Sequence, residues 1–364
     1  MSLNHNLHEV AQRFEFRGEI LSTELYNSGH INDTYCVVLD HKGVRSRCVL
    51  QRINHQVFRN PVALMENIQR VTSHLERKLT DGSPENGQSL TLIPTRNGAA
   101  CTCDTQGNYW RAYRFIEQAR TYDVVDSPRQ AFEVAKAFGR FQRLLSDLPA
   151  PRLHDTIPDF HNTPKRFAAL KKAIAEDAAN RAIEAKAEIE FALRHQAMTT
   201  VLLDACLPER VTHNDTKLNN VMLDDTTGEG VCVIDLDTVM PGLALYDFGD
   251  MVRTSTSPAQ EDERDLSKVT MQFPMFEALA RGYLESTNGF LTTPEKRFLA
   301  FAGKLITFET GVRFLTDFLA GDTYFKVHRN GHNLDRCRTQ FRLVESIEEQ
   351  EDQMAGLIER VSGN

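Results

Sequence analysis

The stretch Val211-Thr-His-Asn-Asp-Thr-Lys-Leu-Asn-Asn220 decides how this chain is interpreted, together with the apolar run Val231-Cys-Val-Ile-Asp235 that follows it. An acid at Asp215 is followed five positions later by the amide of Asn220, and a second acid, Asp235, ends the apolar run. Phosphoryl transfer needs one carboxylate beside the acceptor hydroxyl, and an amide with a second carboxylate to hold the metal on the phosphates. The ordered set of three residues therefore predicts a phosphoryl-transfer site.

Each of these residues has a predicted role and a structural alternative. We expect Asp215 to be the catalytic base that accepts a proton from the substrate hydroxyl, whereas an Asx-turn or a helix cap would be its structural role. His213 is expected to brace the loop. Asn220 and Asp235 form the predicted magnesium site, because oxygen ligands suit that hard cation, with Asn219 as the rival to Asn220. We expect Asp235 to be buried, which is costly unless the carboxylate is paired or bound to metal.

Length, charge and cysteine content exclude several classes of protein. A chain of 364 residues exceeds the usual limit of a single core, so we expect two lobes with a cleft between them. The net charge of −8 argues against a nucleic-acid binder. Seven cysteines without paired metal spacing are typical of free thiols in a reducing compartment. With no pattern of a signal peptide or a membrane span, we expect a cytoplasmic protein with no membrane partner.

The amino-terminal third has the pattern of a small antiparallel sheet with one helix. Residues 34–39 and 48–53 are β-rich runs separated by a turn, which predicts a hairpin. Apolar residues at helical spacing predict a helix over 61–79, and two further strands are expected over 89–94 and 108–116. We place the lobe boundary near residue 117, so that residues 1–117 form a β-rich amino lobe that clamps the nucleotide phosphates.

From residue 127 onward the pattern is helical. Further helices are expected at the segments 165–204 (one or two long helices), 272–288, 294–320 and 335–361. Residues 118–364 are therefore the predicted carboxyl lobe, which is mainly helical and carries the catalytic loop, the metal site and the acceptor site. The fold class that follows is α+β.

Three blocks carry a resemblance to a known family. His213-Asn-Asp-Thr-Lys-Leu-Asn-Asn220 and Ile234-Asp-Leu-Asp-Thr-Val-Met-Pro-Gly242 resemble the aminoglycoside phosphotransferase and choline kinase-like superfamily, and within it the N-acetylhexosamine 1-kinase branch. Phe308-Glu-Thr-Gly-Val-Arg-Phe-Leu-Thr-Asp317 with Gly321-Asp-Thr-Tyr-Phe-Lys326 supports that branch. The resemblance implies a protein kinase-like fold of two lobes, ATP and Mg²⁺ as cofactors, and a small-molecule sugar as substrate.

The resemblance also implies a phosphate-covering turn over residues 27–35. In that turn Gly29 and Asn32 are expected to contact the nucleotide, and His30 to contact either phosphate or sugar. The lysine that kinases usually carry on the next strand is absent from residues 48–53. Arg52 is the predicted substitute, paired with Glu66, although Gln51 would face the cleft if the strand register shifted by one residue.

The hinge and the acceptor site complete the expected machinery. Backbone groups of Ile116 and Glu117 are expected to meet the purine edge. Asp237 would share a strand face with Asp235 if that strand continued, and is a candidate second ligand or substrate contact. By resemblance Arg313 contacts the sugar; an intrahelical ion pair with Asp317, four residues on, is the equally weighted alternative.

These expectations give a function and its rivals. The predicted activity is that of an ATP-dependent small-molecule phosphotransferase that transfers the γ-phosphate to the anomeric hydroxyl of an N-acetylhexosamine. An aminoglycoside, choline, homoserine or another sugar is the alternative acceptor. A nucleotide-binding pseudokinase is the alternative from another class, motivated by the missing lysine.

Overall fold

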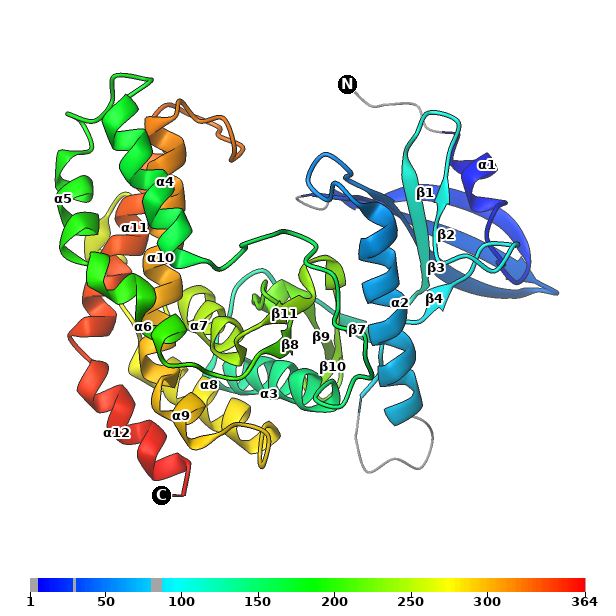
Figure 1. The fold of residues 1–364 in the computed structure, drawn as a ribbon. Coiled ribbons are helices and arrows are strands. Elements are labelled where there is room, and N and C mark those ends of the chain that lie inside the picture. The colour runs from blue at the N-terminus through cyan, green and yellow to red at the C-terminus, as the bar shows by residue number, and fades with distance from the viewer. Residues whose placement is uncertain (1–5, 29–30, 80–86, 364) are drawn as a thin grey trace.

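The computed structural model describes residues 6–28, 31–79 and 87–363. They form a β-rich amino lobe and a larger helical carboxyl lobe, which lie side by side in Figure 1. The predicted α+β class and the two-lobed arrangement are confirmed. Among the described residues, no helix is both long enough and apolar enough to cross a membrane.

The amino lobe is one antiparallel sheet with a helix on each side. Its strands follow the order β1-β2-β3-β6-β4, and β5 also pairs with β6. The elements are β1 (Glu19–Ser28), β2 (Asp33–His41), β3 (Val44–Ile53), β4 (Leu92–Ile93), β5 (Thr102–Cys103) and β6 (Tyr109–Arg114), with helices α1 (Leu7–Ala11) and α2 (Pro61–Lys78). The predicted hairpin is β2–β3 and the predicted helix is α2, whereas β1 was not recognised in the sequence.

Strand alternation divides the sheet into two faces with separate neighbours. Leu39, Leu50 and Trp110 belong to a core on the α1 side. Helix α2 packs on the other side, where it joins the main core of the molecule. It starts sharply because the Asn60 side chain accepts the Ala63 N–H at 3.1 Å and Pro61 occupies the first turn.

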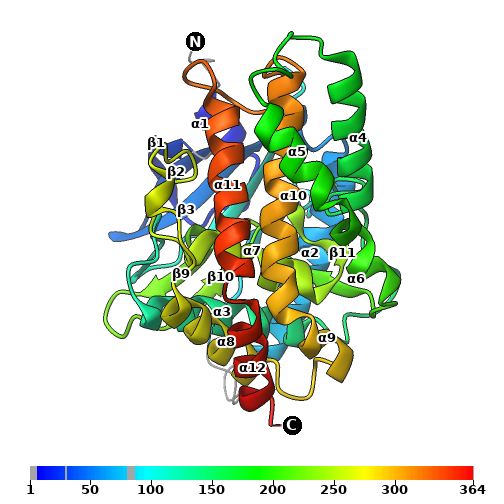
Figure 2. The same ribbon diagram turned by 90° about the vertical axis from the view of Figure 1, so that its left-hand side faces the viewer.

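The carboxyl lobe is built around a long buried helix, α10. Figure 2 shows α10 beside α5 and α11. The helices are α3 (Pro128–Leu144), α4 (Thr163–Glu176), α5 (Lys186–Arg194), α6 (Val201–Asp204), α7 (Ala244–Ser255), α8 (Phe273–Ser286), α9 (Thr293–Arg297), α10 (Leu299–Leu319), α11 (His332–Glu348) and α12 (Glu351–Val361), with 3₁₀ turns η1 (Gln196–Thr200), η2 (Leu218–Asn220), η3 (Leu236–Thr238) and η4 (Leu266–Lys268).

The expectation of one or two long helices over 165–204 is wrong. That segment is divided among α4, α5, η1 and α6. Helix α4 stops at Asp177, which adopts a left-handed backbone conformation with φ of 38°. The Asp177 carboxylate then accepts the N–H groups of Arg181 and Ala182 at 2.8 and 3.0 Å, which satisfies the turn that follows.

Two small sheets of the carboxyl lobe lie next to the loop that carries Asp215. Strands β7 (Ala119–Arg120), β9 (Val221–Asp224) and β10 (Gly230–Val233) form one sheet, and β8 (Arg210–Thr212) pairs with β11 (Met240–Gly242) in the other. Because β6 belongs to the amino-lobe sheet and β7 to a carboxyl-lobe sheet, the chain crosses between lobes over residues 115–118.

Candidate active site

The loop that carries Asp215 lies between β8 and η2 and is fixed by helix α7. Two carboxylates of that helix, Asp247 and Asp250, accept backbone N–H groups of the loop. The distances are 2.8 Å from His213, 2.7 Å from Asn214 and 2.8 Å from Thr216. Both carboxylates are buried, so these bonds hold the loop rigidly against the helix. Asp247 and Asp250 therefore brace the loop.

His213 connects the loop to the end of β10. Its ring is buried against Phe138, with centroids 5.2 Å apart, and its Nε2 lies 2.9 Å from the carbonyl oxygen of Ile234. Because Asp235 follows Ile234, this contact holds the loop that carries Asp215 next to the segment that carries Asp235. The predicted bracing role of His213 agrees with this geometry.

Asp215 is held between an amide and a cation. The Asn220 Nδ2 group donates to its Oδ2 at 3.0 Å, and the Lys217 Nζ lies 3.1 Å from the same oxygen. Burial opposes ionisation of Asp215, but the nearby charge of Lys217 outweighs it and the pKa of the carboxyl is lowered. The carboxylate is thus ionised at neutral pH and able to accept a hydrogen bond from a hydroxyl. We did not assign a role to Lys217 from the sequence, although its spacing of two residues from Asp215 was visible.

Asn220 has an unused side-chain oxygen. Its amide nitrogen is used by Asp215, and its Oδ1 accepts no hydrogen bond from the described part of the chain. The Ile234 N–H donates to the Asn220 carbonyl oxygen at 2.9 Å, which aligns η2 with the segment that leads to Asp235. Asn220, and not its rival Asn219, is the residue in contact with Asp215.

The expectation that Asp235 is a buried carboxylate at the end of a strand is wrong. Strand β10 ends at Val233, and Asp235 itself adopts a left-handed backbone conformation with φ of 58°. That turn directs the chain out of the strand and leaves the side chain exposed. Within the described residues, the carboxylate has neither a hydrogen bond nor an ion pair.

The electrostatic surroundings of Asp235 fit a bound cation. Protein atoms crowd the carboxylate although water reaches it, and their desolvating effect, together with the charges of Asp237 and Asp215, raises its pKa to about 6. A divalent cation would remove that repulsion. The unpaired carboxylate of Asp235 and the free amide oxygen of Asn220 belong to segments whose backbones are hydrogen-bonded, and both are oxygen donors of the kind that Mg²⁺ prefers, with water and phosphate as its usual remaining ligands.

Asp237 differs sharply from Asp235. The chain enters η3 instead of continuing as a strand, so the expected shared strand face does not form. Asp237 is only 3% exposed, forms an ion pair with Arg111 of β6, and accepts the Asn32 Nδ2–H at 2.6 Å. Asn32 also accepts the Asn54 N–H at 3.0 Å. Both bonds of Asp237 come from the amino lobe, so this carboxylate joins the two lobes.

The nucleotide side departs from the sequence prediction. Gly29 and His30 lie outside the described residues. The predicted Arg52–Glu66 pair is wrong, because Arg52 Nε donates to Asp33 at 2.7 Å, whereas Glu66 lies 2.7 Å from the Nε2 of His154. Arg52 also stands opposite Trp110 in the β3–β6 register. It therefore shares the sheet face that packs against α1, not the face toward the carboxyl lobe.

The interlobe hinge has unused backbone groups. Ile116 is buried, and its N–H and C=O have no hydrogen-bond partner among the residues that the structure describes. Glu117 turns its side chain away to Arg47, whose Nε donates to it at 3.1 Å. Free backbone groups at a partly buried hinge suit the edge of a purine, so the contacts expected of Ile116 and Glu117 remain a prediction.

The acceptor end contains a buried histidine–glutamate pair and an arginine. The His161 Nδ1 lies 2.8 Å from Glu309 on α10, and its Nε2 lies 3.4 Å from the carbonyl oxygen of Asn214, the residue before Asp215. Arg313 follows Glu309 by one helical turn. Its guanidinium lies 5.4 and 5.5 Å from the ring centroids of Phe160 and Phe325.

The alternative ion pair between Arg313 and Asp317 does not form. Asp317 is buried and accepts the backbone N–H groups of residues 323–325 at distances of 2.9, 2.8 and 2.9 Å. It thus fixes the segment after α10, which brings Phe325 against Arg313. Across the described ranges, Arg313 has no ion pair with a carboxylate.

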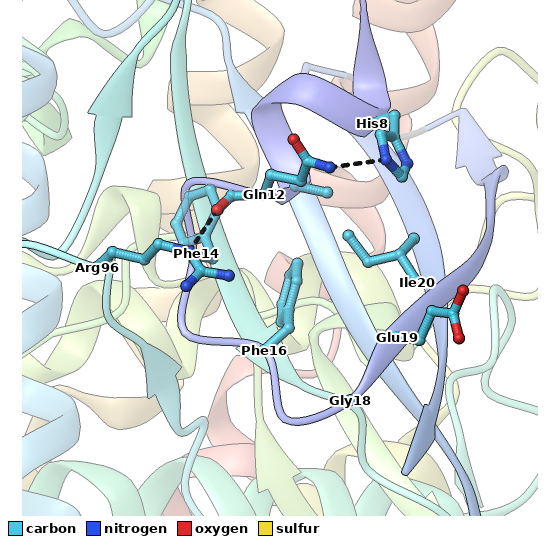
Figure 3. Close-up of a pocket in the computed structure, with 9 residues that line it drawn as sticks. His8, Gln12, Phe14, Phe16, Gly18, Glu19, Ile20 and Arg96 are labelled. Carbon is cyan, nitrogen blue, oxygen red and sulfur yellow. Dashed lines mark hydrogen bonds between the residues drawn. The ribbon is translucent and has the colours of Figure 1, made fainter.

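A separate hollow of about 310 Å³ lies on the amino lobe between α1 and the start of β1 (Figure 3). Phe14, Phe16 and Ile20 supply its apolar wall, and Arg96 closes one side by donating from Nε to the Gln12 carbonyl oxygen at 2.7 Å. None of the predicted site residues lines it. The hollow therefore lies apart from the catalytic cleft.

Comparison with solved structures shows the same fold throughout the chain. An aminoglycoside phosphotransferase from Alicyclobacillus acidocaldarius matches with a TM-score of 0.63 at 13% identity, covering 100% of this chain and 98% of the other. A microcompartment-associated aminopropanol kinase gives 0.57 at 15% identity, with 96% and 98% covered. A choline kinase from Cryptosporidium parvum gives 0.53 at 15%, with 96% and 95% covered.

The family assignment rests on the sequence match. The model of the phosphotransferase enzyme family matches residues 22–280, which is more than half of the chain. The matched range includes the loop with Asp215, the segment with Asp235, and parts of both lobes. Phosphotransferases of this family use ATP with Mg²⁺. This chain belongs to the phosphotransferase enzyme family.

Proposed function

We propose that this protein transfers the γ-phosphate of ATP to the anomeric hydroxyl of an N-acetylhexosamine, giving the sugar 1-phosphate. Asp215 orients the acceptor hydroxyl and accepts its proton, with Lys217 and Asn220 holding the carboxylate in place. Asn220 and Asp235 would hold Mg²⁺, which when bound neutralises charge on the phosphates. Most of the rate acceleration then comes from alignment and charge stabilisation.

The observation that carries the acceptor assignment is the environment of Arg313. This guanidinium lies 5.4 and 5.5 Å from the ring centroids of Phe160 and Phe325. It is one helical turn from Glu309, whose partner His161 contacts the Asn214 carbonyl oxygen. Aromatic faces pack on the apolar face of a pyranose, and a guanidinium donates to hydroxyl or acetamido oxygens. Together with the resemblance of residues 308–326 to N-acetylhexosamine kinases, this environment favours an amide-bearing sugar.

The positive charge near Arg313 also favours a neutral sugar over a cationic acceptor. Arg166 lies close enough to Arg313 that burial, followed by repulsion from Arg313, lowers the pKa of Arg166. Arg166 donates to the Phe160 carbonyl oxygen at 3.0 Å, and no ion pair compensates it within the described residues. Glu309 offsets part of the charge of both guanidiniums, but neither forms an ion pair among the described residues. Two neighbouring guanidiniums therefore favour a neutral sugar over a cationic acceptor such as choline or an aminoglycoside.

The experiment is a panel of acceptors assayed for ADP release from Mg²⁺-ATP. The panel contains N-acetylglucosamine, N-acetylgalactosamine, glucose, choline, homoserine and an aminoglycoside. We expect kcat/KM to be highest for the N-acetyl sugars and at least about tenfold lower for glucose, which lacks the acetamido group. Preferred turnover of choline or of the aminoglycoside would contradict the proposal and retain only the phosphotransferase activity. ATP binding without turnover of any acceptor would favour the pseudokinase.

A further inference from the structure

Strand β3 lacks a lysine, so the cation that binds the nucleotide phosphates has to come from another position. The strand register identifies the side chains that share the face toward the carboxyl lobe. Thr34 of β2, Gln51 of β3 and Arg111 of β6 stand directly opposite one another in neighbouring strands. Gln51 donates to the Thr34 hydroxyl at 3.0 Å and accepts from Arg111 Nε at 3.0 Å. The row therefore ends in a guanidinium one strand away from the usual lysine position.

The Arg111 guanidinium reaches the segment that carries Asp235. It is 1% exposed, and its Nη1 pairs with Asp237, two residues after Asp235. Asp235 also contributes to the electrostatic field at Arg111. A nucleotide whose phosphates share a metal with Asp235 would be brought toward this guanidinium.

One edge of the Arg111 guanidinium is unused. Its Nε donates to Gln51 and its Nη1 to Asp237, while Nη2 has no hydrogen-bond partner in the described parts of the chain. An arginine side chain has five N–H donors in a rigid planar arrangement that matches phosphate oxygens. With two edges fixed by protein groups, the third is already oriented and loses little freedom on binding.

Two other arginines of the sheet, and Lys217 of the carboxyl lobe, are less suitable. Arg52 is on the α1 side and is paired with Asp33. Arg47 is paired with Glu117 at the hinge and lies 3.8 Å over the ring of Phe115. Lys217 belongs to the carboxyl lobe and is paired with Asp215.

We propose that Arg111 binds the nucleotide phosphates through its free guanidinium edge and so replaces the lysine that β3 lacks, with Gln51 and Asp237 holding it in position. The proposal rests on the phosphotransferase activity of the chain and not on the identity of the acceptor. Sequence reasoning missed Arg111 because the missing lysine was sought only along the strand that should carry it.

The test is nucleotide binding without acceptor, measured by calorimetry for Mg²⁺-ATP and for adenosine. Removing Arg111 alone would leave Asp237 buried and unpaired, so the main variant is the neutral pair Arg111→Gln with Asp237→Asn. We expect its ATP affinity to fall about 10- to 100-fold, as for loss of a hydrogen-bonded charge, while adenosine affinity changes less than about twofold. Arg52→Gln, which lies on the other face of the sheet and is paired with Asp33, is the matched control and should bind ATP within about twofold of the wild type.

Two results would overturn the proposal: equal losses of affinity for ATP and adenosine in the double variant, or a selective loss of ATP affinity in Arg52→Gln. If circular dichroism shows that the double variant does not fold, the same calorimetric comparison is made with Arg111→Lys. It keeps the charge but shortens the side chain and removes the planar fork, so ATP affinity should fall at least about threefold with adenosine unchanged. Wild-type ATP affinity in Arg111→Lys would then contradict the proposal. These affinities are measured without acceptor, so they do not depend on whether the acceptor is an N-acetyl sugar.

Discussion

The catalytic loop and the phosphate side of the amino lobe are assembled in different ways. In the loop, Asp215, Lys217 and Asn220 lie within six consecutive residues, and η2 folds them onto one another. In the amino lobe, Thr34, Gln51 and Arg111 come from three strands and meet only through their register. The comparison teaches that chemistry within one loop can be interpreted from spacing, whereas chemistry across strands depends on which face each residue occupies.

The largest expected effect tests the loop. Asp215→Asn keeps the size of the side chain but removes the charge that accepts a proton, so kcat should fall about 10²- to 10⁴-fold. The ATP affinity should remain within about twofold, because Asp215 faces the acceptor. Steady-state kinetics and calorimetry measure both, with the exposed Asp352→Asn of α12 as control. Unchanged kcat in Asp215→Asn would remove Asp215 as the base.

The next largest effect is expected at Asp235, the proposed Mg²⁺ ligand that follows β10. Asp235→Asn should lower activity on the order of 10²-fold or more, because a metal ligand supports several kcal/mol of transition-state stabilisation. The Mg²⁺ concentration for half-maximal activity should rise as well. A titration of activity against Mg²⁺ checks this, and an unaltered Mg²⁺ dependence would show that the metal binds elsewhere.

The pKa of Asp235 is raised, whereas that of Asp215 in the catalytic loop is lowered. Asp235 should therefore give the stability of the fold its own pH dependence. With a pKa of about 6 against the ordinary 3.8, the folded protein retains a proton on Asp235 that the unfolded chain has lost. Without metal, stability should therefore fall as pH rises from about 4 to 6, and Asp235→Asn should reduce that fall. Below pH 6 protons compete with Mg²⁺, so its apparent affinity should fall by up to about tenfold per pH unit.

Thermal melts in EDTA and in Mg²⁺ across this range measure both effects. We also expect Asp235→Asn to melt at a higher temperature than the wild type in EDTA at pH 7.5, because the variant removes a carboxylate that Asp237 and Asp215 repel. A lower melting temperature under those conditions would contradict this electrostatic account.

A smaller effect is expected at the acceptor end. Arg313→Gln should raise the acceptor KM about tenfold, the cost of a hydrogen bond to a charged group, while the KM for ATP stays the same. Arg297→Gln on α9 is the matched control. Equal changes in both KM values would indicate that Arg313 acts on the fold and not on the acceptor.

The smallest effect is expected at the hinge. Glu117→Gln removes the partner of Arg47, but both side chains are well exposed, and exposed pairs contribute little. The KM for ATP should change less than about twofold, since the purine contacts predicted for this segment use the backbone. A tenfold increase would assign the Glu117 side chain a direct role.

Much of the architecture was predictable because its signals are local. The β2–β3 hairpin and helix α2 follow from alternation, from helical spacing and from the start signal at Asn60 and Pro61. The catalytic loop was likewise predictable, because its groups are contiguous. The break after α4 was not, since it depends on the left-handed conformation of Asp177.

The incorrect predictions about the site have related causes. Asp235 was expected at the end of a buried strand, but its own left-handed backbone conformation turns the side chain out and prevents the shared strand face with Asp237. The partners of Arg52 and Asp317 were inferred from proximity in sequence, yet strand register and a folded loop supply different partners. Long-range packing determined each of these outcomes, and one sequence carries no direct signal for it.

The most direct test of the central claim is a phosphorus NMR spectrum of the product formed from Mg²⁺-ATP and N-acetylglucosamine or N-acetylgalactosamine, recorded beside the same reaction with the 1-O-methyl glycoside. The account predicts a sugar 1-phosphate signal from a free N-acetyl sugar and no transfer to its methyl glycoside, whose anomeric oxygen is blocked. Equal transfer to the free sugar and its glycoside, or a phosphate on another oxygen, would contradict the claim that this site phosphorylates the anomeric hydroxyl.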